Sequence, residues 1–181
     1  MKVMPTDLDG VLLIEPHVHG DARGFFFESW HAERFAGAGI DAQFVQDNHA
    51  RSGKHVLRGL HFQQPQAQGK LVRCIAGTIF DVAVDLRRSS KSFGQWAGYM
   101  LSAENKHQLW VPQGFAHGYL TLEDATEVVY KCDAYYAPDH EHVLAWDDPD
   151  VSIDWPLEGA SPKLSVKDRA GKPLAELEGF A

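Results

Sequence analysis

Apolar and polar side chains alternate over residues 56–63 and again over residues 69–73. Period-two alternation is typical of β-strands with one buried face, and the segment between the two runs is rich in turn-forming residues. The pattern predicts a hairpin that holds Arg58, His61 and Lys70 close together. A titratable imidazole beside two fixed cations suits an enzyme that binds an anion and moves a proton. An ordinary charged surface hairpin is the alternative.

Further runs with strand character recur at short intervals along the chain and are separated by glycine and proline turns. They cover residues 11–16, 25–30, 44–49, 78–86, 94–102, 108–112, 115–120, 127–132 and 143–146. Residues 31–38 form the first plausible helix, and a helical turn is expected around residues 173–177. We therefore predict an all-β fold, a jelly-roll barrel with short peripheral helices, in one domain over residues 1–181.

The composition of the chain narrows the classes of function. Of its 181 residues 44% are hydrophobic, yet no apolar run approaches the roughly 20 residues of a membrane span, and the first residues lack the apolar core of a secretory signal. The formal charge of −8 argues against non-specific nucleic-acid binding, although a local cluster of cations can still bind a small anion. Cys74 and Cys132 lie in apolar runs, so we expect reduced thiols in a cytoplasmic protein that engages neither nucleic acid nor membrane.

Short motifs spread along almost the whole chain match the pattern of one enzyme family. They are GDARGFFFES from Gly20, FVQDNH from Phe44, VLRGLHFQ from Val56, QGKLVRC from Gln68, GTIFDVAVDLR from Gly77, FGQW from Phe93, LWVPQGFAHGY from Leu109, YK from Tyr130 and LSVKD from Leu164. In order and spacing they resemble the dTDP-4-dehydrorhamnose 3,5-epimerases. The resemblance implies a cupin-type jelly roll, a homodimer, and no metal or other cofactor. It also implies inversion of C3 and C5 in a thymidine diphosphate (dTDP) 4-keto-6-deoxyhexose, on the route to dTDP-L-rhamnose.

Inversion beside a ketone needs a base, a group that stabilises the enolate oxygen, and an acid on the opposite face of the sugar. His61 suits the base, since an imidazole titrates near working pH, and the resemblance makes Asp168 the carboxylate that orients it. Lys70 is expected to stabilise the enolate oxygen, an interaction worth roughly 3–4 kcal/mol. The resemblance places the acid at Tyr130, and the nearby Tyr136 remains the alternative.

Other charged and polar residues match positions that the family uses to bind the diphosphate and the nucleotide. They are Arg23, Glu28, Gln46, Asp47, Asn48, Arg58, Lys70, His117, Glu141 and Lys167. An arginine suits phosphate because its planar fork can bond two oxygens. The resemblance further implies that Arg23 and Glu28 reach the active site of the partner subunit. His117 could instead bond only the backbone, and we assign no role to Asp81 and Asp85.

Three other functions are compatible with parts of the sequence. A metal-dependent cupin could use His61, His107 and His117, but Gln63 stands where a second ligand is usual and no Glu follows before Lys70. A sugar-binding module without catalysis would lose only affinity on replacement of the base's partner or the acid. A relative that inverts only C3 or only C5, or that acts on a related dTDP-4-keto-6-deoxy sugar, shares the same base and acid, so the sequence does not separate it from a double epimerase.

Overall fold

The computed structural model describes residues 1–181, and most of its regular structure is β-strand. The strands are β1 (Lys2–Pro5), β2 (Leu12–Glu15), β3 (His19–Asp21), β4 (Gly24–Phe26), β5 (Gln46–Ser52), β6 (Leu57–Gln63), β7 (Lys70–Ala76), β8 (Thr78–Asp85), β9 (Trp96–Ser102), β10 (Gln108–Val111), β11 (Phe115–Thr121), β12 (Thr126–Cys132) and β13 (Glu141–Val143). The helices are short: α1 (Ala32–Ala36), η1 (Pro138–His140), α2 (Val166–Arg169) and η2 (Leu174–Glu176). None of them is long and apolar enough to cross a membrane.

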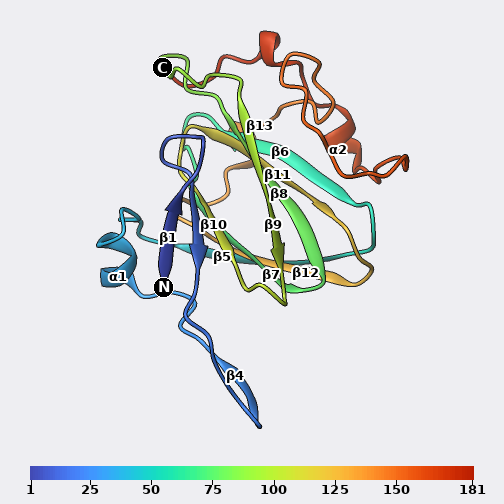
Figure 1. Ribbon diagram of the computed structural model, residues 1–181. Helices are drawn as coiled ribbons and strands as arrows, with labels where there is room; N and C mark the ends of the chain where they lie inside the picture. The colour runs from blue at the N-terminus through green and yellow to red at the C-terminus, as the bar shows by residue number, and fades with distance from the viewer.

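Two antiparallel sheets face each other and form the barrel (Figure 1). One sheet has six strands in the order β1-β2-β10-β7-β12-β5, and the other has five in the order β13-β6-β11-β8-β9. This arrangement confirms the predicted all-β jelly roll with short peripheral helices. The helical turn expected around residues 173–177 is η2, whereas the last predicted strand lies earlier than expected, at β13.

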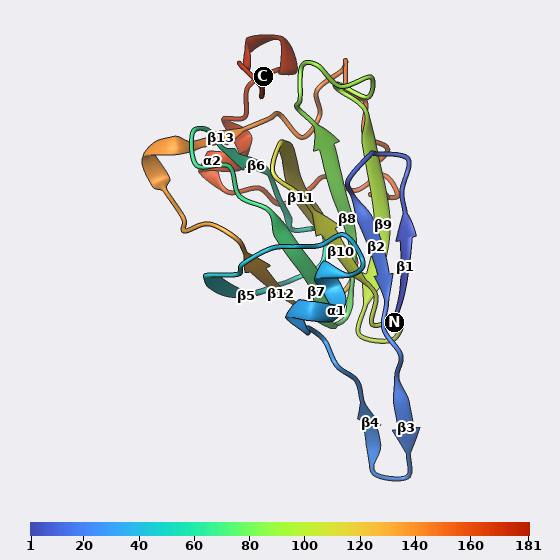
Figure 2. The same ribbon diagram turned by 90° about the vertical axis from the view of Figure 1, so that its left-hand side faces the viewer.

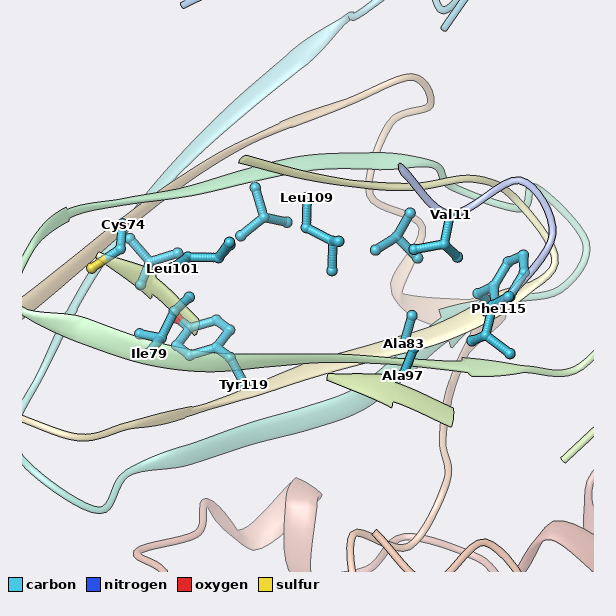
Figure 3. Close-up of a cluster of buried hydrophobic side chains, with 13 residues drawn as sticks. Val11, Cys74, Ile79, Ala83, Ala97, Leu101, Leu109, Phe115 and Tyr119 are labelled. Carbon is cyan, nitrogen blue, oxygen red and sulfur yellow. The ribbon is translucent and has the colours of Figure 1, made fainter. Parts of the chain in front are cut away.

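The barrel core fills the space between the two sheets (Figure 3). Because successive side chains of a strand point to opposite faces, each strand contributes every second residue to this core. Val72 and Cys74 enter from β7, and Phe115 and Tyr119 enter from β11. Polar residues interrupt these inward-facing apolar rows, among them Lys70 on β7. The same alternation that builds the core therefore also places polar groups inside the barrel.

The outer faces of both sheets are covered by irregular segments of the chain. The C-terminal part, drawn in orange and red in Figure 1, packs Leu144, Val151, Trp155 and Leu177 against the five-stranded sheet. Helix α1 and the loop after it bury apolar side chains, including Phe35, against the six-stranded sheet. Covering the outer face of the five-stranded sheet also brings the C-terminal helix α2 close to β6.

Strands β3 and β4 form a hairpin that projects from the body of the molecule (Figure 2). A run of apolar residues predicted one strand over residues 25–30, but only its first part is a strand, and the side chains there are not buried. Phe25 is 63% and Phe26 is 71% exposed. The predicted strand was too long, and local hydrophobicity alone does not say whether the chain itself covers the side chains of a strand. This hairpin is called the N-terminal arm below.

The predicted hairpin around His61 and Lys70 is also wrong in its pairing. Both of its strands exist, as β6 and β7, but β6 lies in the five-stranded sheet and β7 in the six-stranded sheet. The turn residues between them carry the chain from one sheet to the other. Both side chains still line one pocket, which the facing surfaces of the two sheets enclose.

Candidate active site

A pocket of about 470 Å³ opens between the two sheets. Its polar and charged lining comes from strands of both sheets and from the C-terminal segment. These residues are Gln46, Asn48, Arg58, His61, Gln63, Gln68, Lys70, His117, Tyr119, Tyr130, Tyr136, Glu141, Ser165, Lys167 and Asp168. Most of the residues predicted from the sequence are thus brought together, and three cations line a pocket in a chain of net charge −8.

His61 and Asp168 form a hydrogen-bonded pair at the wall of this pocket. His61 Nε2 lies 2.6 Å from Asp168 Oδ1, and Ser165 Oγ donates to the other carboxylate oxygen at 2.7 Å. Burial alone would raise the pKa of Asp168, but the hydrogen bonds from His61 and Ser165 outweigh it and lower the pKa to about 2. The carboxylate is therefore ionised at neutral pH and holds the proton of His61 on Nε2. Nδ1 is left as a proton acceptor.

An irregularity in β6 allows both Arg58 and His61 to face the pocket. The two residues are three apart, so a regular strand would point them to opposite faces. The register between β6 and β11 shifts at this point, so that Gly59 and Leu60 oppose Gly118 alone. A Cβ on Gly59, which has φ of 125°, would lie 2.6 Å from the Cα of Gly118. The two glycines thus permit the bulge that turns both functional side chains inward.

Lys70 enters from the six-stranded sheet and is almost fully buried, with 7% exposure. Its Nζ donates to the Gln68 carbonyl at 3.1 Å. Burial lowers the pKa of Lys70, and the negative charges of Asp133 and Glu141 oppose that shift. A cation in such a place is poorly hydrated. Its electrostatic attraction to a nearby negative charge is therefore stronger than that of a lysine on the surface.

His117 lies directly opposite His61 in the pairing of β11 with β6. Its Nε2 lies 2.8 Å from Oδ1 of Asp81, a carboxylate with 0% exposure. The side-chain contact of His117 is therefore to a carboxylate, and the alternative of a bond to the backbone alone is wrong. Asp81, to which the sequence assigned no role, is paired inside the barrel. Asp85 is also fully buried and is bonded to Arg87.

Tyr130 and Tyr136 both line the pocket but differ in their surroundings. Tyr130 lies on β12, packs against the barrel core and makes no hydrogen bond within the chain through its hydroxyl. Burial raises its pKa. Tyr136 is half exposed, and its hydroxyl donates to Glu141 Oε2 at 2.9 Å. This hydrogen bond, together with burial, raises the pKa of Tyr136.

Further polar groups that line the pocket are paired with one another. Lys167 Nζ donates to both Glu141 oxygens at 2.8 and 2.9 Å. Gln46 Nε2 donates to Asn48 Oδ1 at 3.0 Å, and both side chains reach the pocket because they are two residues apart on β5. Asp47 between them points to the other face and pairs with Lys131 at 3.0 Å. Strand parity therefore keeps the Asp47 side chain out of this pocket, and its role in substrate binding stays a prediction.

Arg23 and Glu28 also lie outside the pocket of their own chain. Arg23 sits on the N-terminal arm with its side chain 90% exposed and bonded to Asp21. Glu28 follows the arm and is bonded to Arg34 at 2.9 Å. Neither residue contributes to the 470 Å³ pocket.

The histidines of the chain do not gather into a metal-binding group. No cluster of three or more His, Cys, Asp or Glu with metal-binding geometry is present in residues 1–181. His61 and His117 are neighbours, but each Nε2 already faces a carboxylate. His107, the third histidine considered from the sequence, does not line the pocket.

Sequence reasoning missed two further residues that organise the site. Gln63 is buried and fixes the loop before η1: its Nε2 donates to the Tyr135 carbonyl at 3.2 Å, and its Oε1 accepts from the Ala137 N–H at 2.9 Å. Ser165 caps helix α2 by accepting from the Asp168 N–H at 3.1 Å. The cap was detectable as a serine three residues before an acidic residue, whereas nothing in the sequence marks the partners of Gln63.

The chain is similar over almost its whole length to known proteins of one family. A family model described as dTDP-4-dehydrorhamnose 3,5-epimerase matches residues 5–176. A curated protein of that description from Pseudomonas aeruginosa is 55% identical over 99% of both chains. The structure of a dTDP-6-deoxy-D-glucose-3,5-epimerase from Legionella pneumophila, in complex with dTDP-4-keto-L-rhamnose, is 50% identical, with a TM-score of 0.95 over 98% of this chain and 94% of that one. A 3′-monoepimerase from Streptomyces bikiniensis, in complex with dTDP-quinovose, is 36% identical, with a TM-score of 0.89 over 94% and 87%.

Proposed function

Because this chain belongs to the dTDP-4-dehydrorhamnose 3,5-epimerase family, we propose that its pocket uses His61 as base and Tyr130 as acid to epimerise a dTDP-4-keto sugar. The reaction inverts C3 and C5 of dTDP-4-dehydro-6-deoxy-D-glucose and gives dTDP-4-dehydro-L-rhamnose. This product is used in the biosynthesis of dTDP-L-rhamnose. The observation that carries the assignment is the placement of the two residues. His61 projects from the five-stranded sheet and Tyr130 from the six-stranded sheet, and both line one pocket.

Inversion follows from this placement on opposite walls. A proton leaves the sugar towards His61 Nδ1, and a proton returns to the other face of the planar enolate from the Tyr130 hydroxyl. Asp168 keeps Nδ1 free to accept, because its carboxylate holds the proton on Nε2. A base and an acid of this kind each contribute typically 10²–10⁴-fold in rate.

One oxyanion site can serve both inversions. C3 and C5 both flank the C4 carbonyl, so abstraction at either carbon places negative charge on the same oxygen. Lys70 is buried in the same pocket as the base, and its interaction with the oxygen is strongest when that charge develops. A single cation in this position therefore supports loss of the proton from C3 and from C5.

The remaining pocket residues suit the dTDP part of the substrate. Arg58 is held by two hydrogen bonds to Ser52 Oγ, at 3.1 and 3.2 Å, so its guanidinium is preorganised for a phosphate. Lys167, His117, Glu141, Gln46 and Asn48 line the same space.

The N-terminal arm supports a homodimer in which active sites are shared. Two exposed phenylalanines on a projecting hairpin form the kind of apolar surface that another protein covers. We assign that partner to a second copy of this chain, with Arg23 and Glu28 delivered to the pocket of the partner subunit. A role for both residues in the pocket of the partner subunit accounts for their absence from the pocket of their own chain. The two cysteines are free and buried, which supports a reducing compartment such as the cytoplasm.

Shared sites can be tested by mixing two inactive variants. An Arg23→Ala subunit and a His61→Ala subunit are each expected to be defective alone. After exchange of subunits, half of the dimers are mixed, and each mixed dimer has one complete site, so about a quarter of parent activity should return. Activity that stays at the level of the single variants would show that Arg23 acts on its own chain.

The reaction itself is tested by proton NMR after incubation of the enzyme with dTDP-4-keto-6-deoxyglucose in heavy water. Epimerisation at both centres predicts deuterium at C3 and C5 in an inverted product. Deuterium and inversion at one carbon alone would identify a monoepimerase. A substrate that keeps all its hydrogens would contradict the proposed activity.

A further inference from the structure

The barrel contains a second histidine–carboxylate pair, formed by His117 and Asp81. The His117 Nε2 lies 2.8 Å from Asp81 Oδ1, and Asp81 has no exposed surface. The second oxygen of the carboxylate, Oδ2, is buried and has no hydrogen-bond partner. A buried oxygen without a partner is costly, so the position of Asp81 needs an explanation beyond packing.

The two pairs stand side by side but differ in how the carboxylate is treated. Asp168 accepts from Ser165 in addition to His61, which stabilises its negative charge. Asp81 receives only the contact from His117. Hydrogen bonds from two side chains therefore stabilise the anionic form of Asp168, whereas Asp81 has a hydrogen-bond partner only in His117.

This difference sets the number of protons that each pair carries. With two protons the His117–Asp81 pair has no net charge, and with one proton it has a charge of −1. Burial away from water disfavours net charge, and it raises the pKa of Asp81 against the opposing effect of His117. Asp81 has no exposed surface, so its surroundings favour the uncharged two-proton pair. Because Oδ2 has no hydrogen-bond partner to accept an O–H, the second proton is placed on Nδ1 of His117, whichever side the shared proton occupies.

The other groups around this pair complete its electrostatic setting. Those that face it inside the barrel are Arg58 and His61 on β6, Lys70 and Cys74 on β7, Tyr99 on β9, Tyr119 on β11 and Tyr130 on β12. Burial raises the pKa values of Cys74, Tyr119 and Tyr130, so these groups stay neutral near pH 7. None of them donates a hydrogen bond to Asp81 that would stabilise the one-proton state.

We propose that Asp81 is a positioning residue that keeps a proton on Nδ1 of His117, so that His117 donates a hydrogen bond into the pocket while the adjacent His61 accepts a proton. The proposal rests on the proposed epimerase function, in which the acceptor of that bond is a substrate oxygen that gains negative charge. The neighbouring histidines His61 and His117 then have opposite roles, proton acceptor and hydrogen-bond donor, because the carboxylates bonded to them have different surroundings.

The protonation state can be read directly from the ring nitrogens of the parent enzyme. In ¹⁵N-labelled protein, histidine side-chain spectra at pH 7.5 should show Nδ1 of His117 protonated and Nδ1 of His61 unprotonated. The signals are assigned by their loss in His117→Gln and His61→Gln. An unprotonated His117 Nδ1 overturns the proposal, and this result does not depend on whether the enzyme turns over any substrate.

Two substitutions of Asp81 separate proton donation from packing. Asp81→Leu removes the polar partner, and we expect kcat to fall by about 10- to 100-fold with little change in KM. Asp81→Asn can donate from its amide to Nε2 and so keeps the proton on Nδ1. It should therefore have a kcat closer to that of the parent than Asp81→Leu has. Equal losses in both variants, or parent-like kcat in Asp81→Leu, would contradict the proposal.

A control variant accounts for the cost of losing a buried polar group. Thr126 is fully buried on β12, and its Oγ1 donates to the Glu123 carbonyl at 2.8 Å, away from the pocket. Thr126→Val should lower stability by about 1 kcal/mol and leave kcat unchanged. If Thr126→Val lowers kcat as much as Asp81→Leu does, the effect of Asp81 is on stability alone, and the proposal fails. If the Asp81 variants do not fold, the spectra of the parent enzyme still decide it.

Discussion

Replacing Tyr130 by phenylalanine removes one hydroxyl group and keeps the ring. The ring packs against the barrel core, and the hydroxyl makes no hydrogen bond within the chain. The substitution leaves no donor or acceptor of the protein without its partner. We therefore expect the free energy of unfolding to change by less than about 0.5 kcal/mol.

The catalytic loss should be much larger than the structural one. Burial raises the pKa of Tyr130, so the hydroxyl keeps its proton across the neutral range and is available as the acid. Removing a general acid costs about 10²–10⁴ in rate, which corresponds to about 3–5 kcal/mol in the activation free energy of inversion. A variant that folds like the parent and fails to invert would localise the defect to proton return.

Heavy water distinguishes loss of the acid from loss of the base. The Tyr130→Phe enzyme still has His61, whose side chain is 26% exposed and can exchange its proton with solvent. The base can therefore remove a proton and return deuterium to the same face, so deuterium should appear at C3 with little inverted product. His61→Ala should abolish both inversion and exchange. Proton NMR of the sugar follows the two processes separately.

Two results would refute this reasoning. If Tyr130→Phe inverts both centres at near the parent rate, Tyr130 is not the acid. Tyr136, which lines the same pocket, then becomes the candidate. If His61→Ala retains exchange, the base lies elsewhere in the pocket.

Three further predictions concern other parts of the site. Lys70→Ala should lower kcat by on the order of a hundredfold with a smaller change in KM, because the cation acts mainly on the enolate; a change in KM alone would make Lys70 a ground-state binder. Asp168 has a pKa lowered from 3.8 to about 2, so it stabilises the fold above pH 4 and this contribution disappears as the pH falls through 2. Asp168→Asn should then lose about 2 kcal/mol at pH 6 in denaturant unfolding, and its difference from the parent should close near pH 2; a gap that is independent of pH contradicts the shift. Treatment with a chelator should leave epimerase activity intact, and loss that one divalent metal restores would disprove metal independence.

The sequence by itself located most of the strands and the residues now proposed for the chemistry. Alternation along β6 and β8 is local, because the period of two follows from the geometry of a single strand. The motifs from Gly20 to Asp168 matched the family on which the comparisons agree. Residues such as His61 and Lys70 were therefore assigned to one site before any contact was known, although their roles in the reaction remain proposals.

Tertiary structure alone decided the partners of those strands and side chains. The segment between β6 and β7 contains turn residues that suit a hairpin equally well, yet it connects two sheets, because strand pairing depends on the whole barrel. His61 and Asp168 are 107 residues apart and meet only because the C-terminal segment covers the outer face of the five-stranded sheet. Asp81 looked like one more charge in an alternating strand until β11 placed His117 beside it. Hydrophobic periodicity records which face of a strand is buried, whereas the identity of the neighbour on that face is a property of the assembled fold.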